Sequence, residues 1–84
     1  MEKTARVASE VGLHARPAAV IARAVEQFDA PVYISLNGET VEATSGLMIM
    51  TLGAQCGDEV TVSSEDSQAV EAVCNLIESS IQPL

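Results

Sequence analysis

The alternation of apolar and polar residues along the chain predicts four short strands. Such alternation buries one side of a strand and leaves the other side in solvent. In the second of these segments, Val32, Ile34 and Leu36 share one side. The Asn37-Gly38 pair that follows is typical of a type I′ hairpin turn, because both central residues of that turn have positive φ. The four predicted strands span residues 3–8, 32–36, 40–43 and 59–63.

Apolar residues at helical spacing predict two amphipathic helices. The first spans residues 16–27, and the side that faces the sheet carries Ile21, Val25 and Phe28. The second helix closes the chain, and residues 64–66 supply its cap and an acidic first turn. Its apolar stripe comprises Val70, Val73, Cys74, Ile77 and Ile81.

A short apolar run, residues 47–52, fits either a strand or a helix by its pattern alone. Ser45 suits an N-cap and Gly53 suits a helix stop, so we predict a short helix. A run this apolar cannot bury every side chain, and exposed apolar side chains mark a contact surface. We expect Leu47 and Met50 to be the exposed ones. The alternative is that the whole run belongs to the core.

The predicted element order is β-α-β-β-α-β-α, which makes the chain an α+β protein. Helices on one face of a four-stranded, mostly antiparallel sheet form a two-layer sandwich. The 84 residues suit one domain, 1–84, and leave no room for a second. We expect the core to be built from aliphatic side chains, because the chain has one Phe, one Tyr and no Trp.

Composition and charge narrow the classes of function. Twelve acidic residues against four basic ones give a net charge of −8, which argues against nucleic acid as a partner. No apolar run approaches the length that spans a bilayer, and no signal-peptide pattern follows Met1, so we expect a cytoplasmic monomer without a membrane partner. Cys56 and Cys74 belong to no Cys/His cluster, so we expect no metal site. A disulfide between them stays open as an alternative, although reduced thiols fit a cytoplasmic protein better. We expect no cofactor.

The strongest chemical signal is the stretch Gly12-Leu13-His14-Ala15-Arg16-Pro17-Ala18. Its proline is favoured in the first turn of a helix, so His14 and Arg16 lie where a helix begins. The free N–H groups and the partial positive charge at that end suit a phosphate. A histidine alone in this place is more often a surface or capping residue. Together, an imidazole nucleophile, a guanidinium and an anion cradle are the parts that phosphoryl transfer needs.

At this point the chain resembles a known family. Gly12–Ala18 and a second block, Ser45–Gly53, together resemble HPr, the histidine-containing phosphocarrier of the bacterial phosphoenolpyruvate-dependent sugar phosphotransferase system (PTS). The Asn37-Gly38 hairpin and Gly57 also fall where the family has them, and the similarity covers essentially the whole chain. The resemblance implies an open-faced sandwich with three helices on one face. It also implies a carrier with a transient phosphohistidine rather than a stand-alone enzyme.

The resemblance implies roles for individual residues in the first block. His14 would accept a phosphoryl group on Nδ1 from Enzyme I and pass it to the IIA units of sugar permeases. Arg16 would neutralise the phosphoryl oxygens. The backbone N–H groups of Arg16 and its neighbours would help to hold those oxygens, and Pro17 would shape the start of the helix.

The resemblance also implies a docking surface beside the histidine. Ala19, Leu47 and Met50 would form its apolar part. In this family, Enzyme I presents an acidic surface to basic carrier residues, and this chain offers chiefly Arg16 and Arg23 for that contact. The simpler interpretation of Arg23 is a solvated charge on the helix.

Ser45 has two interpretations. In some bacteria the corresponding serine is phosphorylated by a dedicated kinase, which adds a serine kinase or regulators to the candidate partners. The family usually has a large apolar residue directly after this serine, whereas this chain has Gly46. We therefore favour the plain N-cap role for Ser45 over regulatory phosphorylation.

Other functions remain as alternatives. The same chemistry could serve a nitrogen-regulatory or dihydroxyacetone-type phosphorelay. A regulatory binding module that has lost phosphotransfer is less favoured, because His14 and Arg16 are both intact. A hydrolase triad lacks a second histidine to act as the base.

Overall fold

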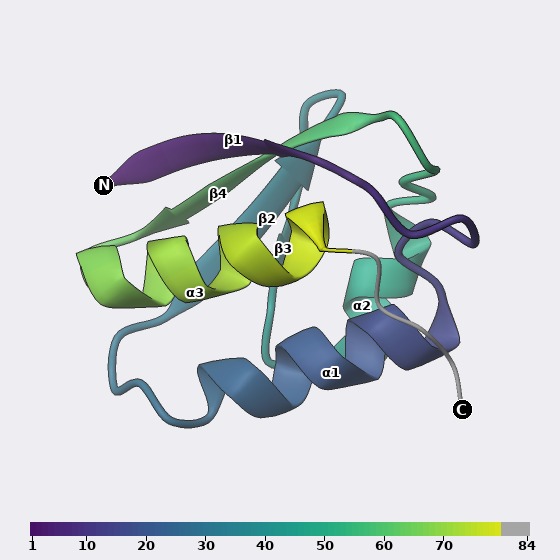
Figure 1. The fold of residues 1–84 in the computed structure, drawn as a ribbon. Coiled ribbons are helices and arrows are strands. Elements are labelled where there is room, and N and C mark those ends of the chain that lie inside the picture. Colours follow the sequence, from purple (N-terminus) through teal and green to yellow (C-terminus); the bar gives the residue numbers. More distant parts are fainter. Residues whose placement is uncertain (80–84) are drawn as a thin grey trace.

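The computed structural model describes residues 1–79, and the elements within them follow the predicted β-α-β-β-α-β-α order (Figure 1). The strands are β1 (Glu2–Arg6), β2 (Val32–Leu36), β3 (Glu39–Glu42) and β4 (Glu59–Ser64). The helices are α1 (Ala15–Val25), α2 (Gly46–Thr51) and α3 (Ser67–Glu78).

The strands form one antiparallel sheet in the order β1-β4-β2-β3. The last strand in the sequence therefore lies inside the sheet, between the first and the second. Ala5 pairs with Val60 across β1 and β4. Ile34 of β2 pairs with Val62 on one side and with Val41 on the other. Residues opposite one another in a sheet point to the same face, so these pairs build one apolar face.

The core lies between that apolar face and the helices. Figure 1 shows the helices on the same side of the sheet, with α1 packed beside both α2 and α3. The predicted two-layer α+β sandwich is thus confirmed. The fully buried side chains of the three helices include Ala18, Ile21, Ile49, Val70, Val73, Cys74 and Ile77.

The opposite face of the sheet is polar. Hydroxyl side chains from all four strands lie in one register row, in which Thr4 pairs with Thr61, Thr61 with Ser35, and Ser35 with Thr40. The hydroxyl oxygens of Ser35 and Thr40 lie 2.9 Å apart and share a hydrogen bond. An antiparallel sheet with one such face needs no second covering layer, so the fold stays open on that side.

Two turns have the geometry that the sequence predicts. Asn37 and Gly38 have φ values of 52° and 85°, which are the positive angles that a type I′ hairpin needs. Gly53 ends α2 with a φ of 66°, and its N–H donates to the carbonyl of Met50 at 3.1 Å.

The boundaries of the two long helices differ from the prediction. Helix α1 ends at Val25, and Phe28 packs against the core from the turn beyond it. Ser64 belongs to β4, and the N-cap of α3 is Asp66, whose carboxylate accepts the N–H groups of the residues two and three positions on. The first turn of α3 therefore holds no acidic residue, contrary to expectation. Ile81, predicted for the apolar stripe, lies outside the described residues.

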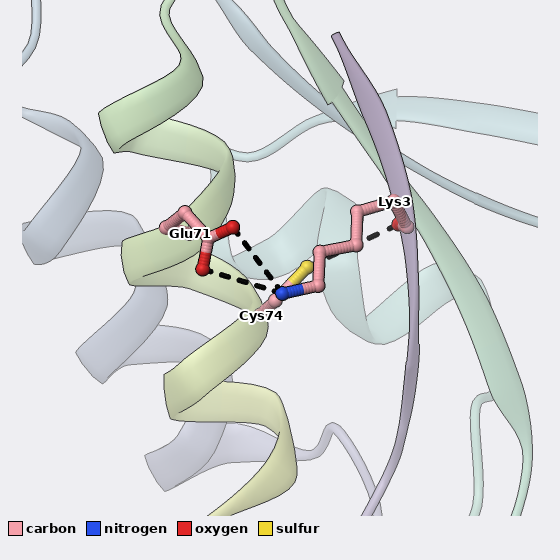
Figure 2. Close-up of polar contacts among 3 residues, drawn as sticks. All are labelled: Lys3, Glu71 and Cys74. Atoms are coloured by element: carbon pink, nitrogen blue, oxygen red, sulfur yellow. Dashed lines mark hydrogen bonds and ion pairs between the residues drawn. The ribbon is translucent and has the colours of Figure 1, made fainter.

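Polar contacts tie β1 to α3 (Figure 2). Lys3 Nζ donates to both carboxylate oxygens of Glu71, at 3.3 and 3.2 Å. The Glu71 carboxylate raises the pKa of Lys3. The thiol of Cys74 is buried beneath this pair, and its Sγ lies 3.9 Å from the carbonyl oxygen of Lys3. Burial raises the pKa of Cys74 because a thiolate is poorly solvated there.

Candidate functional site

His14 is the N-cap residue of α1 and lies at the surface. Its backbone is extended, with φ −97° and ψ −158°, and its side chain makes no capping hydrogen bond. The imidazole is therefore free to meet a ligand in front of the helix. The sequence predicted a helix from residue 16, and α1 begins one residue earlier, at Ala15.

The first turn of α1 presents backbone donors beside the imidazole. The N–H of Ala18 donates to the carbonyl of His14 at 2.9 Å, and Pro17 has no N–H. That leaves the N–H groups of Ala15 and Arg16, for which residues 1–79 provide no backbone acceptor. The first turn of α1, directly after His14, thus combines two amides without a described acceptor, the positive end of the helix dipole and an exposed arginine, and this combination suits a phosphoryl group.

The first turn of α1 carries Arg16 and no acidic residue, although the protein as a whole has a net charge of −8. Lys3 is paired with Glu71 and Arg6 with Glu59, whereas within residues 1–79 Arg16 has no carboxylate at ion-pair distance. Distant exposed carboxylates act weakly here, because the screening length in physiological salt is about 8 Å. The local donors therefore dominate the electrostatics of the site.

A second free cation lies on the same side of α1. Arg23 is exposed, as is Ala19 between it and Arg16, and no ion pair within residues 1–79 involves Arg23. Residues three and seven positions apart lie on roughly the same side of an α-helix, and Arg16, Ala19 and Arg23 are all exposed. The face carries two positive charges and a small apolar side chain between them.

Exposed apolar side chains of α2 continue this face. Gly46, the first residue of α2, packs against the backbone of Ala18 and Ala19. Leu47 directly after it is 69% exposed, as expected, and Met48 is 45% exposed. We call Ala19, Leu47 and Met48 the apolar patch.

The expectation that Met50 would be exposed is wrong. Met50 is partly buried and packs against the core, while Met48 takes the exposed position. The signal that could have separated them is Thr51, the one polar residue of the run. Leu47 and Met48 lie four and three positions before Thr51, so helical geometry puts all three on the solvent side. Met50 lies outside that spacing.

Ser45 caps the helix that carries the apolar patch. Its Oγ accepts the N–H of Met48 at 3.2 Å. The predicted N-cap is thus confirmed as a structural role. The serine is half-buried at the junction of β3 and α2.

The site is a surface rather than a cavity. Two grooves of the described surface, one lined by Tyr33 and Ser63 and the other by Phe28 and Glu42, do not include His14. Within residues 1–79, no group of three His, Cys, Asp or Glu side chains is arranged to hold a metal ion. Cys56 and Cys74 are both free thiols. None of the described helices is long and apolar enough to cross a membrane.

An open-faced sandwich with an exposed histidine at the start of its first helix fits a phosphocarrier protein, and the comparisons with known proteins give the same class. The PTS-HPr family, described as the PTS HPr component phosphorylation site, matches residues 1–79. The chain therefore belongs to the HPr family of PTS phosphocarriers, as its resemblance to that family predicted.

Relatives share this assignment along most of their length. The phosphocarrier protein HPr of Vibrio cholerae serotype O1 is 41% identical over 76 residues, which cover 90% of this chain and 89% of the relative. That of Treponema pallidum is 37% identical over 71 residues, covering 84% and 81%. The crystal structure of HPr from Bacillus anthracis matches with a TM-score of 0.86 at 32% identity, covering 92% of this chain and 95% of the relative.

Proposed function

We propose that His14 is the residue that carries the phosphoryl group in this PTS phosphocarrier. Its ring nitrogen Nδ1 attacks the phosphorus held by phosphorylated Enzyme I. The new bond from nitrogen to phosphorus forms as the bond from phosphorus to the donor breaks. The reverse exchange then passes the same group to a IIA unit of a sugar permease. The observation that carries this proposal is the exposed, uncapped side chain of His14 at the N-cap of α1, next in the chain to the N–H groups of Ala15 and Arg16, for which residues 1–79 provide no backbone acceptor.

Arg16 and the helix start stabilise the transferring group in this proposal. A phosphoryl group in transfer spreads negative charge over its oxygens, so catalysis consists mainly of positioning and charge stabilisation. The Arg16 guanidinium supplies a mobile charge, and the two amides supply fixed donors. Pro17 occupies the third helical position, where its fixed φ favours the helical start and its missing N–H breaks no bond.

The apolar patch and Arg23 form the docking surface for Enzyme I and IIA partners. Exposed apolar side chains, together with two arginines that form no ion pair within residues 1–79, fit a partner with an apolar centre and an acidic rim. Met50 supports this surface from its partly buried position. The chain acts as a monomer, and its two free thiols fit the reducing cytoplasm.

Ser45 serves as an N-cap in this proposal rather than as a kinase target. Its Oγ is already engaged with the N–H of Met48. A serine kinase or other regulators would need that bond to open or to be replaced by phosphate oxygens. The comparisons lend no support to a nitrogen-related or dihydroxyacetone-type relay, or to a regulatory module without phosphotransfer.

The test is phosphorylation by the cognate Enzyme I with radiolabelled phosphoenolpyruvate. The wild-type chain is expected to take up one acid-labile phosphate, and His14→Ala is expected to take up none. Arg16→Ala should slow the transfer by about 10²-fold, since removal of one charge-stabilising donor typically costs that much. Arg23→Ala is the matched control, because it removes the same charge from the docking surface and should mainly raise KM.

Equal labelling of His14→Ala would refute the assignment. An unlabelled wild-type chain would instead favour the regulatory module. A second step tests the onward transfer. When a IIA protein is added to the labelled carrier, the label is expected to leave His14 and to appear on the IIA protein.

A further inference from the structure

The loop after α2, residues 53–58, lies against residues 7–13, the segment that leads to His14. Val7 donates its N–H to the carbonyl of Asp58 at 2.8 Å, and Gly57 donates to the carbonyl of Val7 at 2.8 Å. Farther along, Leu13 donates its N–H to the carbonyl of Ala54 at 2.9 Å. The segment is thus held by this loop at its beginning and again at the residue directly before His14.

The two segments approach each other most closely at Gly12. This glycine has a φ of +73°, and a Cβ built there would overlap the Ala54 carbonyl oxygen and lie 3.0 Å from Gln55 Cα. Gly38 also has a positive φ, of +85°, but a Cβ there would meet nothing within 4 Å. Gly12 is therefore required both by its backbone angle and by the neighbouring loop.

The hydrogen bond from Leu13 to Ala54 is shielded from solvent. Leu13 is 3% exposed and Ala54 is 4% exposed. Water competes poorly for such a bond, so it constrains the Leu13 peptide more firmly than a surface bond would. His14 follows directly, and its side chain has no capping bond of its own. The direction of the imidazole therefore depends on the backbone that this bond holds.

We propose that Ala54 is a positioning residue for phosphoryl transfer. Its carbonyl, through the Leu13 N–H, sets where α1 begins and aims the His14 ring at the point served by the free amides. Ala54 touches no phosphoryl group and acts only through Leu13. This inference rests on the proposed role of His14. It adds the loop after α2 to the parts of the molecule that determine the rate of phosphoryl transfer.

The test compares two glycine substitutions with similar backbone strain. Gly12→Ala places a methyl group against Ala54, whereas Gly38→Ala places one in open space at a similar φ. In phosphorylation by Enzyme I, Gly12→Ala is expected to lower kcat by about 10- to 100-fold, the loss expected from a misplacement near 1 Å. Its KM for Enzyme I should stay unchanged, because the docking surface is untouched. Gly38→Ala should keep the wild-type kcat.

Amide hydrogen exchange of Leu13 reports on the bond itself. The Leu13 amide is expected to be protected in the wild-type chain and in Gly38→Ala, and to exchange faster in Gly12→Ala. Should Gly12→Ala not fold, Ala54→Gly carries the same test, because it loosens the loop while keeping the carbonyl. It should give faster Leu13 exchange together with a smaller fall in kcat.

Two results would overturn the inference alone. One is an unchanged kcat in a folded variant that has lost Leu13 protection. The other is an equal fall in kcat for Gly12→Ala and Gly38→Ala, which would point to general destabilisation. A wild-type chain that takes up no phosphate overturns the proposed function and this inference together.

Discussion

Gly46 faces the backbone of Ala18 so closely that a Cβ at Gly46 would lie 3.6 Å from the Ala18 carbonyl oxygen. This is one of the contacts through which α2 meets α1. The distance is that of ordinary van der Waals contact, so one methyl group fits. The φ of Gly46 is not positive, and its backbone is therefore open to any residue. The family pattern of a larger residue after the serine is thus compatible with this backbone at the level of Cβ.

Gly46→Ala should therefore stabilise the protein. Alanine restricts the unfolded chain more than glycine does, so the free energy of unfolding should rise by about 0.5 kcal/mol. Urea denaturation measures this change. Gly38→Ala is the control, because its φ of 85° opposes any side chain and its stability should fall. A loss of stability in Gly46→Ala would mean that α2 packs closer to α1 than the structure indicates.

Ser45→Ala should destabilise the protein by about 1 kcal/mol, because the N–H of Met48 loses its N-cap acceptor. Ser45→Asp should retain most of the stability, since aspartate is also a strong N-cap. Denaturant unfolding gives both values. The neighbouring Thr44→Ala is a matched control with an exposed hydroxyl, and it should change stability by less than about 0.5 kcal/mol. An equal effect at both positions would contradict the capping role.

The two thiols should differ sharply in reactivity. Cys56 is exposed, whereas Cys74 is buried and its pKa is raised by that burial. In the native protein a thiol-reactive aromatic disulfide should modify Cys56 quickly and Cys74 only after unfolding. Cys56→Ser leaves Cys74 as the only thiol and serves as the control. Rapid labelling of the native Cys56→Ser variant would show that α3 opens away from the sheet.

Alkaline pH should lower the free energy of unfolding because Cys74 ionises more easily in the unfolded chain. A thiol whose pKa is higher in the folded state stabilises the fold below the pKa of the unfolded thiol, about 8.5. As the pH rises past that value, the unfolded state loses its proton first, so the free energy of unfolding decreases. Cys74→Ala should remove this part of the pH dependence. Denaturant unfolding at a series of pH values measures this dependence. If the free energy of unfolding fell equally with pH in the wild type and in Cys74→Ala, ionisation of Cys74 would not be the cause.

The ion pair between Lys3 and Glu71 should contribute little in salt. Both side chains are about half exposed, so the pair is screened. Glu71→Gln should lower the unfolding temperature slightly at low ionic strength and leave it unchanged at about 1 M salt. The Glu71 carboxylate raises the pKa of Lys3, so the contribution persists through neutral pH. On the alkaline side, the contribution is lost as the pH rises through that raised pKa. If the unfolding temperatures of the wild type and Glu71→Gln still differed at high salt, Glu71 would contribute through packing rather than through its charge.

Local chemistry determines most of the candidate site. The position of His14 and Arg16 follows from Pro17, whose ring favours a helical first turn. The hairpin follows from Asn37 and Gly38, which adopt positive φ as the sequence required. These features depend on residues next to one another, so the sequence is enough to predict them.

Burial around α2 was predicted only in part. Leu47 is exposed as expected, but Met48 and Met50 exchange the places assigned to them. The helical spacing from Thr51, the polar residue of this run, puts Leu47 and Met48 on the solvent side, and the prediction did not use that spacing. The cap of α3 falls within residues 64–66 as predicted, but pairing of Ser64 with Val32 extends β4 and leaves Asp66 as the cap, so the expected acidic first turn is absent from α3.

The amino-acid sequence alone therefore determined the elements, their order, the turn residues and the imidazole at a helix start. Each of these follows from interactions over a few residues. The tertiary structure decided the β1-β4-β2-β3 order, the exposed face shared by α1 and α2, and the bond from Leu13 to Ala54. That bond joins backbone groups of residues 41 positions apart in the chain. Because every non-proline residue has the same carbonyl and N–H groups, no pattern of side chains in the sequence could predict it.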